Sequence, residues 1–146
     1  MANAVIPGKT LRVGVDEALY AAAGGAINTT GAMGVFGFPP ITALWRGILV
    51  VSLVPVGGTV TTSSFQLEIS LAPQGSINGA SAFGIFNKLV IATPATLCPY
   101  SGIVLTSAAP VALDLSGMGG NGQMRLNFTT VTLGTGTGFD VYARIG

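Results

Sequence analysis

The acidic side chains are the first candidates for chemistry, because the 146-residue chain contains no histidine. The usual general base at neutral pH and the commonest metal ligand are therefore both missing. The five acids are Asp16, Glu17, Glu68, Asp114 and Asp140. We expect the last three on the solvent-exposed faces of strands, where they solubilise the surface and form no paired-carboxylate site. This pattern predicts that the chain is not an enzyme and holds no metal or cofactor.

Two glycine-rich runs resemble nucleotide-binding motifs in their spacing. The run Gly117–Gly122 matches G-x-G-x-x-G and follows an alternating apolar segment. The dinucleotide fingerprint needs a helix directly after it, whereas residues 123–129 alternate as a strand does. The run Gly134–Gly138 lacks the lysine of a phosphate-binding loop. We interpret both runs as connections between strands.

The single cysteine, Cys98, excludes an intramolecular disulfide and fits a reducing compartment. Its neighbours Leu97, Pro99 and Tyr100 predict a small, inert apolar side chain rather than a reactive thiol.

The six basic residues form no cluster in the sequence, and the formal net charge is only +1. Because phosphate neutralisation needs clustered Lys and Arg, we expect no nucleic-acid partner. We consider two interpretations of Lys9 and Arg12: they are solvated surface charges, or they bind an acidic scaffold. A membrane partner is not predicted either, because no apolar stretch reaches the about 18 residues of a spanning helix.

The low charge of the whole chain is its most informative property. Charged residues make up 8 % of the sequence, where about 25 % is typical of soluble domains. Weak self-repulsion favours association near neutral pH. We infer that part of the surface is normally covered by sister subunits, by a larger scaffold, or by both.

Period-two alternation of apolar residues predicts an all-β chain with little helix. The segment Ala43–Val54 differs because both of its alternate faces are apolar over Ile48–Val51, which indicates a central strand or an outer face that meets another subunit. Glycine, proline and serine clusters separate the segments. The expected strands are Ala43–Val54, Val60–Thr62, Phe65–Leu71, Phe83–Ala92, Ile103–Thr106, Val111–Ser116, Gln123–Thr129 and Phe139–Ile145. About eight short antiparallel strands in one domain predict a jelly-roll or Greek-key sandwich.

The first 40 residues form a different region, so we divide the chain into residues 1–40 and a sandwich of residues 41–146. Thr10–Val15 fits a strand, and Asp16 could cap a short helix over Glu17–Ala23. Residues 26–40 are rich in Gly, Ala and Thr, too apolar for ordinary disorder. We interpret this stretch as an N-terminal arm that orders against a neighbour.

Four aromatic or basic residues are candidates for burial at an interface: Phe36, Phe38, Trp45 and Arg46. Trp and Arg are enriched in binding hot spots, although packing of Trp45 in the core is the simpler interpretation.

The size, the charge-poor Ala/Gly/Thr/Val composition, the arm through Phe36–Pro40 and the closing segment Phe139–Gly146 resemble bacteriophage head decoration (cement) proteins. That resemblance implies a structural virion component, assembled in the host cytoplasm, that forms trimers or similar homo-oligomers. Its partners would be copies of itself and the major capsid protein. It would sit on the capsid surface and bridge neighbouring capsomers against internal pressure.

Two other functions fit the same fold class. A trimeric receptor- or glycan-binding head of the adhesin or fibre-tip type would use its loops, but the Gly, Ala and Thr of these loops disfavour it. A ligand-carrying β-barrel would need a hollow interior.

Overall fold

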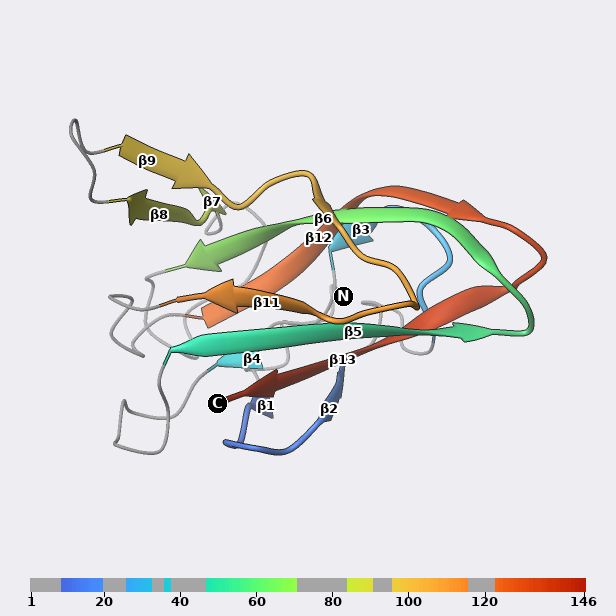
Figure 1. Cartoon of the computed structure of the whole chain (residues 1–146), viewed down its shortest axis with the longest axis horizontal. Coiled ribbons are helices and arrows are strands. Elements are labelled where there is room, and N and C mark those ends of the chain that lie inside the picture. Colours follow the sequence, from blue (N-terminus) through green and yellow to red (C-terminus); the bar gives the residue numbers. More distant parts are fainter. Residues whose placement is uncertain are drawn as a thin grey trace, which may run out of the picture.

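The structure is a computed structural model that describes residues 9–19, 26–32, 36–37, 47–70, 84–90, 96–115 and 123–146. Within these ranges every regular element is a β-strand and none is a helix. Two sheets face one another as a sandwich (Figure 1). The prediction of an all-β fold is confirmed.

Two long chain segments form the centre of both sheets. In the first, β5 (Ile48–Val56) leads into β6 (Val60–Ser70), and in the second, β12 (Gln123–Leu133) leads into β13 (Gly138–Ile145). β6 pairs with β12 in one sheet, and β5 pairs with β13 in the other, both antiparallel. The sandwich is therefore one two-stranded ribbon folded over on itself, with both bends at the right of Figure 1.

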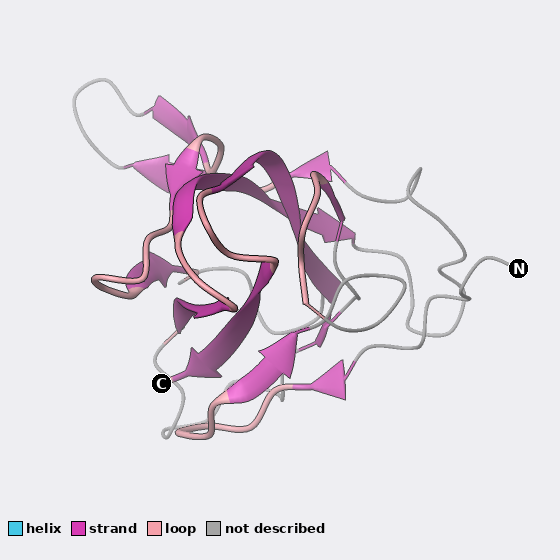
Figure 2. Cartoon of the chain, turned by 90° about the vertical axis from the view of Figure 1, so that its right-hand side faces the viewer, coloured by secondary structure: helices cyan, strands magenta, loops and turns pink. Residues whose placement is uncertain are grey.

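Glycines allow the ribbon to bend. Gly57 and Gly58 have φ angles of 73° and 153°, a region that other residues rarely adopt. The two bends are joined by reciprocal hydrogen bonds: the Thr59 amide donates to Thr135 Oγ1 at 3.0 Å, and the Thr135 amide donates to Thr59 Oγ1 at 3.0 Å. Figure 2 looks onto this end of the molecule. The predicted turns at these glycines are confirmed.

Short strands extend both sheets. Sheet A, which contains β6 and β12, adds β1 (Lys9–Thr10), β3 (Gly31–Ala32), β4 (Phe36–Gly37), β7 (Gly84–Ile85) and β10 (Ile103–Val104). Sheet B has the order β11-β5-β13-β2, with β11 at Val111–Asp114 and β2 at Glu17–Leu19. A separate hairpin of β8 (Asn87–Val90) and β9 (Thr96–Pro99) projects at the upper left of Figure 1.

Alternate residues of the long strands fill the space between the sheets, as their apolar period predicts. Phe65, Phe128 and Phe139 are almost completely buried, with ring centroids 5.6 Å apart for Phe65–Phe128 and 5.3 Å for Phe128–Phe139. The β5 strand lies inside sheet B, between β11 and β13, which confirms that it is central.

The helix expected over Glu17–Ala23 is wrong where the structure describes it. Glu17–Leu19 is β2, and it pairs antiparallel with β13. Glu17 and Leu19 are buried while Ala18 between them is half-buried, a period of two. The open edge of β13 offers hydrogen-bond partners that outweigh the weak helical preference of three residues. Residues 20–23 lie outside the described ranges.

Four short strands of the first 40 residues, β1 to β4, pair within the two sheets of the same chain. β1 and β4 are a parallel pair, and β3 and β4 pair with β12. An arm ordered by a neighbour stays a prediction, as does the jelly-roll or Greek-key path.

Candidate functional site

Among the described residues, one ion pair has both side chains nearly buried. Arg125 Nε donates to Glu68 Oε1 at 2.6 Å across the β6–β12 pair. Only 5 % of Glu68 is exposed, so the expectation of a solvent-exposed Glu68 is wrong. Glu68 lies between β12 and β7 in sheet A, and polar side chains from its neighbours converge on it. Asp114 and Asp140 are half-buried.

The surroundings of Glu68 keep its carboxylate ionised. Burial alone raises the pKa of Glu68, but hydrogen bonds from Asn127, Gln66 and Arg125, with the charge of Arg125, lower the pKa by more. Asn127 Nδ2 and Gln66 Nε2 both donate to Glu68 Oε2. A carboxylate whose two oxygens are both engaged and whose pKa is lowered is a poor general acid or base. We interpret this group as structural.

Arg12 is the one proposed interface residue whose side chain the structure describes. It is exposed, and its Nε and Nη2 atoms each lie 2.9 Å from Oε1 of buried Glu17. Arg12 therefore neutralises a carboxylate of its own chain, while its exposed side chain remains accessible to a partner.

For the other proposed interface residues, the structure gives the strand position of two and does not describe the remaining three. Lys9 and Phe36 are register partners in the β1–β4 pair, at the border of sheet A. Phe38, Trp45 and Arg46 lie outside the described residues, as does Gly117–Gly122. The structure thus brings Lys9 and Phe36 together, while Arg12 lies between β1 and β2 in the chain.

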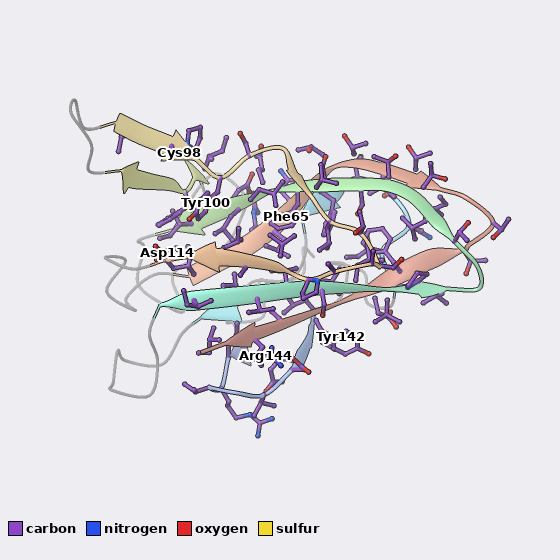
Figure 3. The ribbon with its side chains drawn as sticks, viewed as in Figure 1. Phe65, Cys98, Tyr100, Asp114, Tyr142 and Arg144 are labelled. Carbon is purple, nitrogen blue, oxygen red and sulfur yellow. The ribbon has the colours of Figure 1, made fainter. Side chains whose placement is uncertain are left out.

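Three exposed apolar side chains belong to strands at, or next to, one border of sheet A. β10 and β7 both pair with β6 on the side away from β12, and the β8–β9 hairpin continues from them. Leu97 is 66 % exposed and Val104 is 59 % exposed, and Ile85 is also exposed. We call Ile85, Leu97 and Val104 the hairpin edge. Cys98, expected to be an inert apolar side chain, is exposed beside Leu97 because its strand belongs to this projecting hairpin (Figure 3).

The Tyr100 side chain links the base of the β8–β9 hairpin to sheet B. The Tyr100 hydroxyl donates to the Asp114 carbonyl oxygen at 2.7 Å, and its ring packs against Phe86 with centroids 5.5 Å apart. Figure 3 shows Tyr100 and Asp114 at the same end of the molecule. This contact holds the base of the hairpin against β11.

A second surface is the outward side of β5 and β13 in sheet B, which we call the β5–β13 face. Its rows are Val54 beside Asp140, Ser52 beside Tyr142, and Val50 beside Arg144. Val54 is 48 % exposed. Tyr142 and Arg144 lie on the side of β13 away from Phe65 (Figure 3). Apart from Asp140 and Arg144, these rows carry no charge.

The sequence signals for the two surfaces differ in strength. The apolar outer positions of β5 were visible in the unbroken run at Ile48–Val51. The hairpin edge was not predicted, because Pro94 and Pro99 indicated turns in the segment where the structure has β9. An isolated Leu97 in such a stretch gave no periodic signal.

The described part of the chain contains no group of three or more His, Cys, Asp or Glu side chains able to hold a metal ion. Nor does any described segment form a helix long and apolar enough to cross a membrane. No protein-family model matches the chain, and neither a curated protein nor a solved structure shows significant similarity to it.

Proposed function

We propose that this chain is a structural virion component of the head decoration type, which associates with copies of itself and stabilises a capsid lattice. The observation that carries the proposal is the exposure of apolar side chains on a charge-poor β-sandwich. Leu97, Val104 and Val54 are about half exposed or more on a lone chain. Surfaces of this kind mark interaction sites.

Charge supports the same function. The surface of the lone chain is 7539 Å², and the chain has only six basic and five acidic residues. Glu17 and Glu68 are buried and neutralised within the chain, so they contribute little to repulsion between molecules. Such a surface favours repeated contacts with similar surfaces.

The interior favours assembly over ligand transport. Phe65, Phe128 and Phe139 pack against each other between the sheets, with apolar side chains from both sheets around them. A ligand-carrying barrel needs open space at that position.

The first test is the absolute mass of the folded protein, measured by size-exclusion chromatography with light scattering across a range of concentrations. A reducing agent must be present, so that disulfides between exposed Cys98 side chains do not mimic association. We expect a trimer or another defined oligomer.

Co-sedimentation with purified capsid shells is the second test. Retention of the protein on shells supports the decoration function. A protein that stays monomeric at every concentration and does not sediment with shells would contradict it.

A further inference from the structure

The β5–β13 face has a symmetric arrangement that suits a second copy of itself. Tyr142 lies in the middle of its three outward rows, with Asp140 two residues before it and Arg144 two residues after it on β13. On β5, the same three rows hold Val54, Ser52 and Val50. The two charged residues are thus equally distant from Tyr142, about 7 Å along the strand, and opposite in sign.

These two charges are only weakly satisfied within one chain. Arg144 Nη1 lies 3.6 Å from Asp16 Oδ1, and the two side chains are 46 % and 61 % exposed. The Asp140 side chain has no hydrogen bond or ion pair with any residue that the structure describes. A pair such as Arg144–Asp16 contributes little to stability, so Arg144 can exchange Asp16 for a partner's acid, and no side-chain contact within the described chain competes for Asp140.

Two copies can stack their β5–β13 faces against each other and be related by a two-fold axis. The axis lies in the plane between the two faces, perpendicular to the strands, at the level of Tyr142. This rotation reverses the strand direction, so β13 of one copy lies over β13 of the other, antiparallel. Asp140 then faces Arg144 of the second copy, and the same contact recurs on the other side of the axis. Stacked sheets are about 10 Å apart, a gap that the combined lengths of an Arg and an Asp side chain can span.

The same two-fold rotation also places the uncharged residues of the β5–β13 face against suitable residues of the second copy. Val54 of one copy faces Val50 of the other, and Ser52 and Tyr142 each face their own counterpart at the axis. Apolar meets apolar and acid meets base, which is the self-complementarity that an isologous interface requires. Two tyrosines at the centre supply the aromatic contact that interface centres favour.

We propose that the β5–β13 face is a two-fold interface between copies of this chain, held by reciprocal Asp140–Arg144 pairs around Tyr142. The biological role of this interface rests on the proposed function, since a shell made of many copies needs contacts between them. The four strands of sheet B cover on the order of 500 Å² in projection. A stable interface buries about 800 Å² per partner, so this contact is weak alone and is reinforced by neighbouring contacts in a shell.

The test uses single charge reversals, Asp140→Arg and Arg144→Asp, in an Asp16→Asn background that removes the nearby third charge. In either variant alone, like charges face each other twice across the axis. When the two variants are mixed, both pairs become complementary again. Thr132→Arg, on the exposed outer side of sheet A, is the matched control for an added charge.

Sedimentation equilibrium from about 5 to 500 µM covers the range of a weak dimer. We expect each reversal to weaken self-association at least about tenfold. The equimolar mixture should recover it, and Thr132→Arg should leave it unchanged. Thermal melting of each variant checks that it is folded.

Two outcomes overturn the interface and bear differently on the function. If folded reversal variants associate as the parent does, another surface joins the copies and the decoration function stands. If the parent itself stays monomeric over this range, the two-fold interface is wrong, and co-sedimentation with capsid shells then decides the function separately.

Discussion

At the residue scale, Glu68 and Arg125 determine how one side of sheet A is stabilised. Their side chains are only 7 % and 12 % exposed, and Glu68 also accepts hydrogen bonds from Gln66 and Asn127. Breaking such a pair leaves an uncompensated charge away from water. The network therefore fixes the register of β6 against β12 through their side chains as well as their backbones.

Glu68→Gln keeps the shape of the side chain and removes its charge, so Arg125 loses its ion pair with Glu68. We expect a loss of about 2 kcal/mol in the free energy of unfolding. Urea unfolding followed by circular dichroism measures it. Asp16→Asn is the control, because its exposed 3.6 Å pair with Arg144 is worth less than about 0.5 kcal/mol. Equal effects of the two substitutions would contradict the structural role of Glu68.

The same network predicts how stability depends on pH. The pKa of Glu68 is lower in the folded chain than in the unfolded one, because hydrogen bonds and Arg125 outweigh burial. The contribution of its charge is therefore complete above the unfolded pKa of about 4.3 and is lost as the pH falls through the folded pKa. We expect the stability gap between the parent and Glu68→Gln to be widest near neutral pH and to narrow in acid. A gap that stays constant down to about pH 3 would show that ionisation of Glu68 contributes nothing.

At the element scale, the bends that fold the β5–β6 and β12–β13 ribbon set the architecture. Thr59 and Thr135 exchange amide and hydroxyl hydrogen bonds there, and the Gly134 and Gly136 amides both donate to the Thr59 carbonyl oxygen at 3.0 Å. The bends pack so closely that side chains are excluded at their glycines. Each bend supports the other, so the sheets cannot separate at this end without breaking both.

Gly58→Ala tests the closeness of the bends. A Cβ at Gly58 would lie 2.5 Å from Thr135 Oγ1 and 2.6 Å from the Thr135 carbonyl carbon, at a φ angle of +153°. We expect a loss of about 3 kcal/mol in the free energy of unfolding. Gly84→Ala in β7 is the matched control, because an added Cβ meets nothing within 4 Å there. A melting temperature for Gly58→Ala equal to that of Gly84→Ala would count against the tight bend.

At the scale of the whole molecule, the two outer sides of the sandwich differ in chemistry. The outward pairs of sheet A are polar: Thr62 with Thr132, Ser64 with Thr130, Gln66 with Asn127 and Glu68 with Arg125. Sheet B instead presents Val50, Val54 and Tyr142 between two charges. Thr62, Thr130 and Thr132 of sheet A are exposed to water, and Glu68 and Arg125 neutralise each other within the chain. The contacts between copies that we propose therefore use sheet B and the hairpin edge.

The absence of histidine predicts how association responds to pH. No side chain with an ordinary pKa between about 5 and 7.5 is present. We therefore expect the mass measured by light scattering at a fixed concentration to be constant from about pH 5.5 to 7. A steep change of mass within this interval would contradict an interface that contains no histidine.

The sequence by itself determined the class of the fold and the position of its bends. Alternation at Phe65–Leu71 and Phe139–Ile145 indicated one buried face per strand, and the glycines at 57–58 and 134–138 indicated the turns. These signals are local: a period of two and a positive φ angle are properties of neighbouring residues. The absence of histidine and the low charge were equally visible without a structure.

Only the tertiary structure decided where the strands find their partners. Glu68 is buried because Arg125, 57 residues away, lies opposite it, and Glu17–Leu19 is a strand because the edge of β13 is open to it. Alternation shows which residues share a face but not what lies against that face. The rows Asp140–Val54 and Arg144–Val50 exist only once β13 pairs with β5 in this register, because strand pairing joins residues that are distant in the chain.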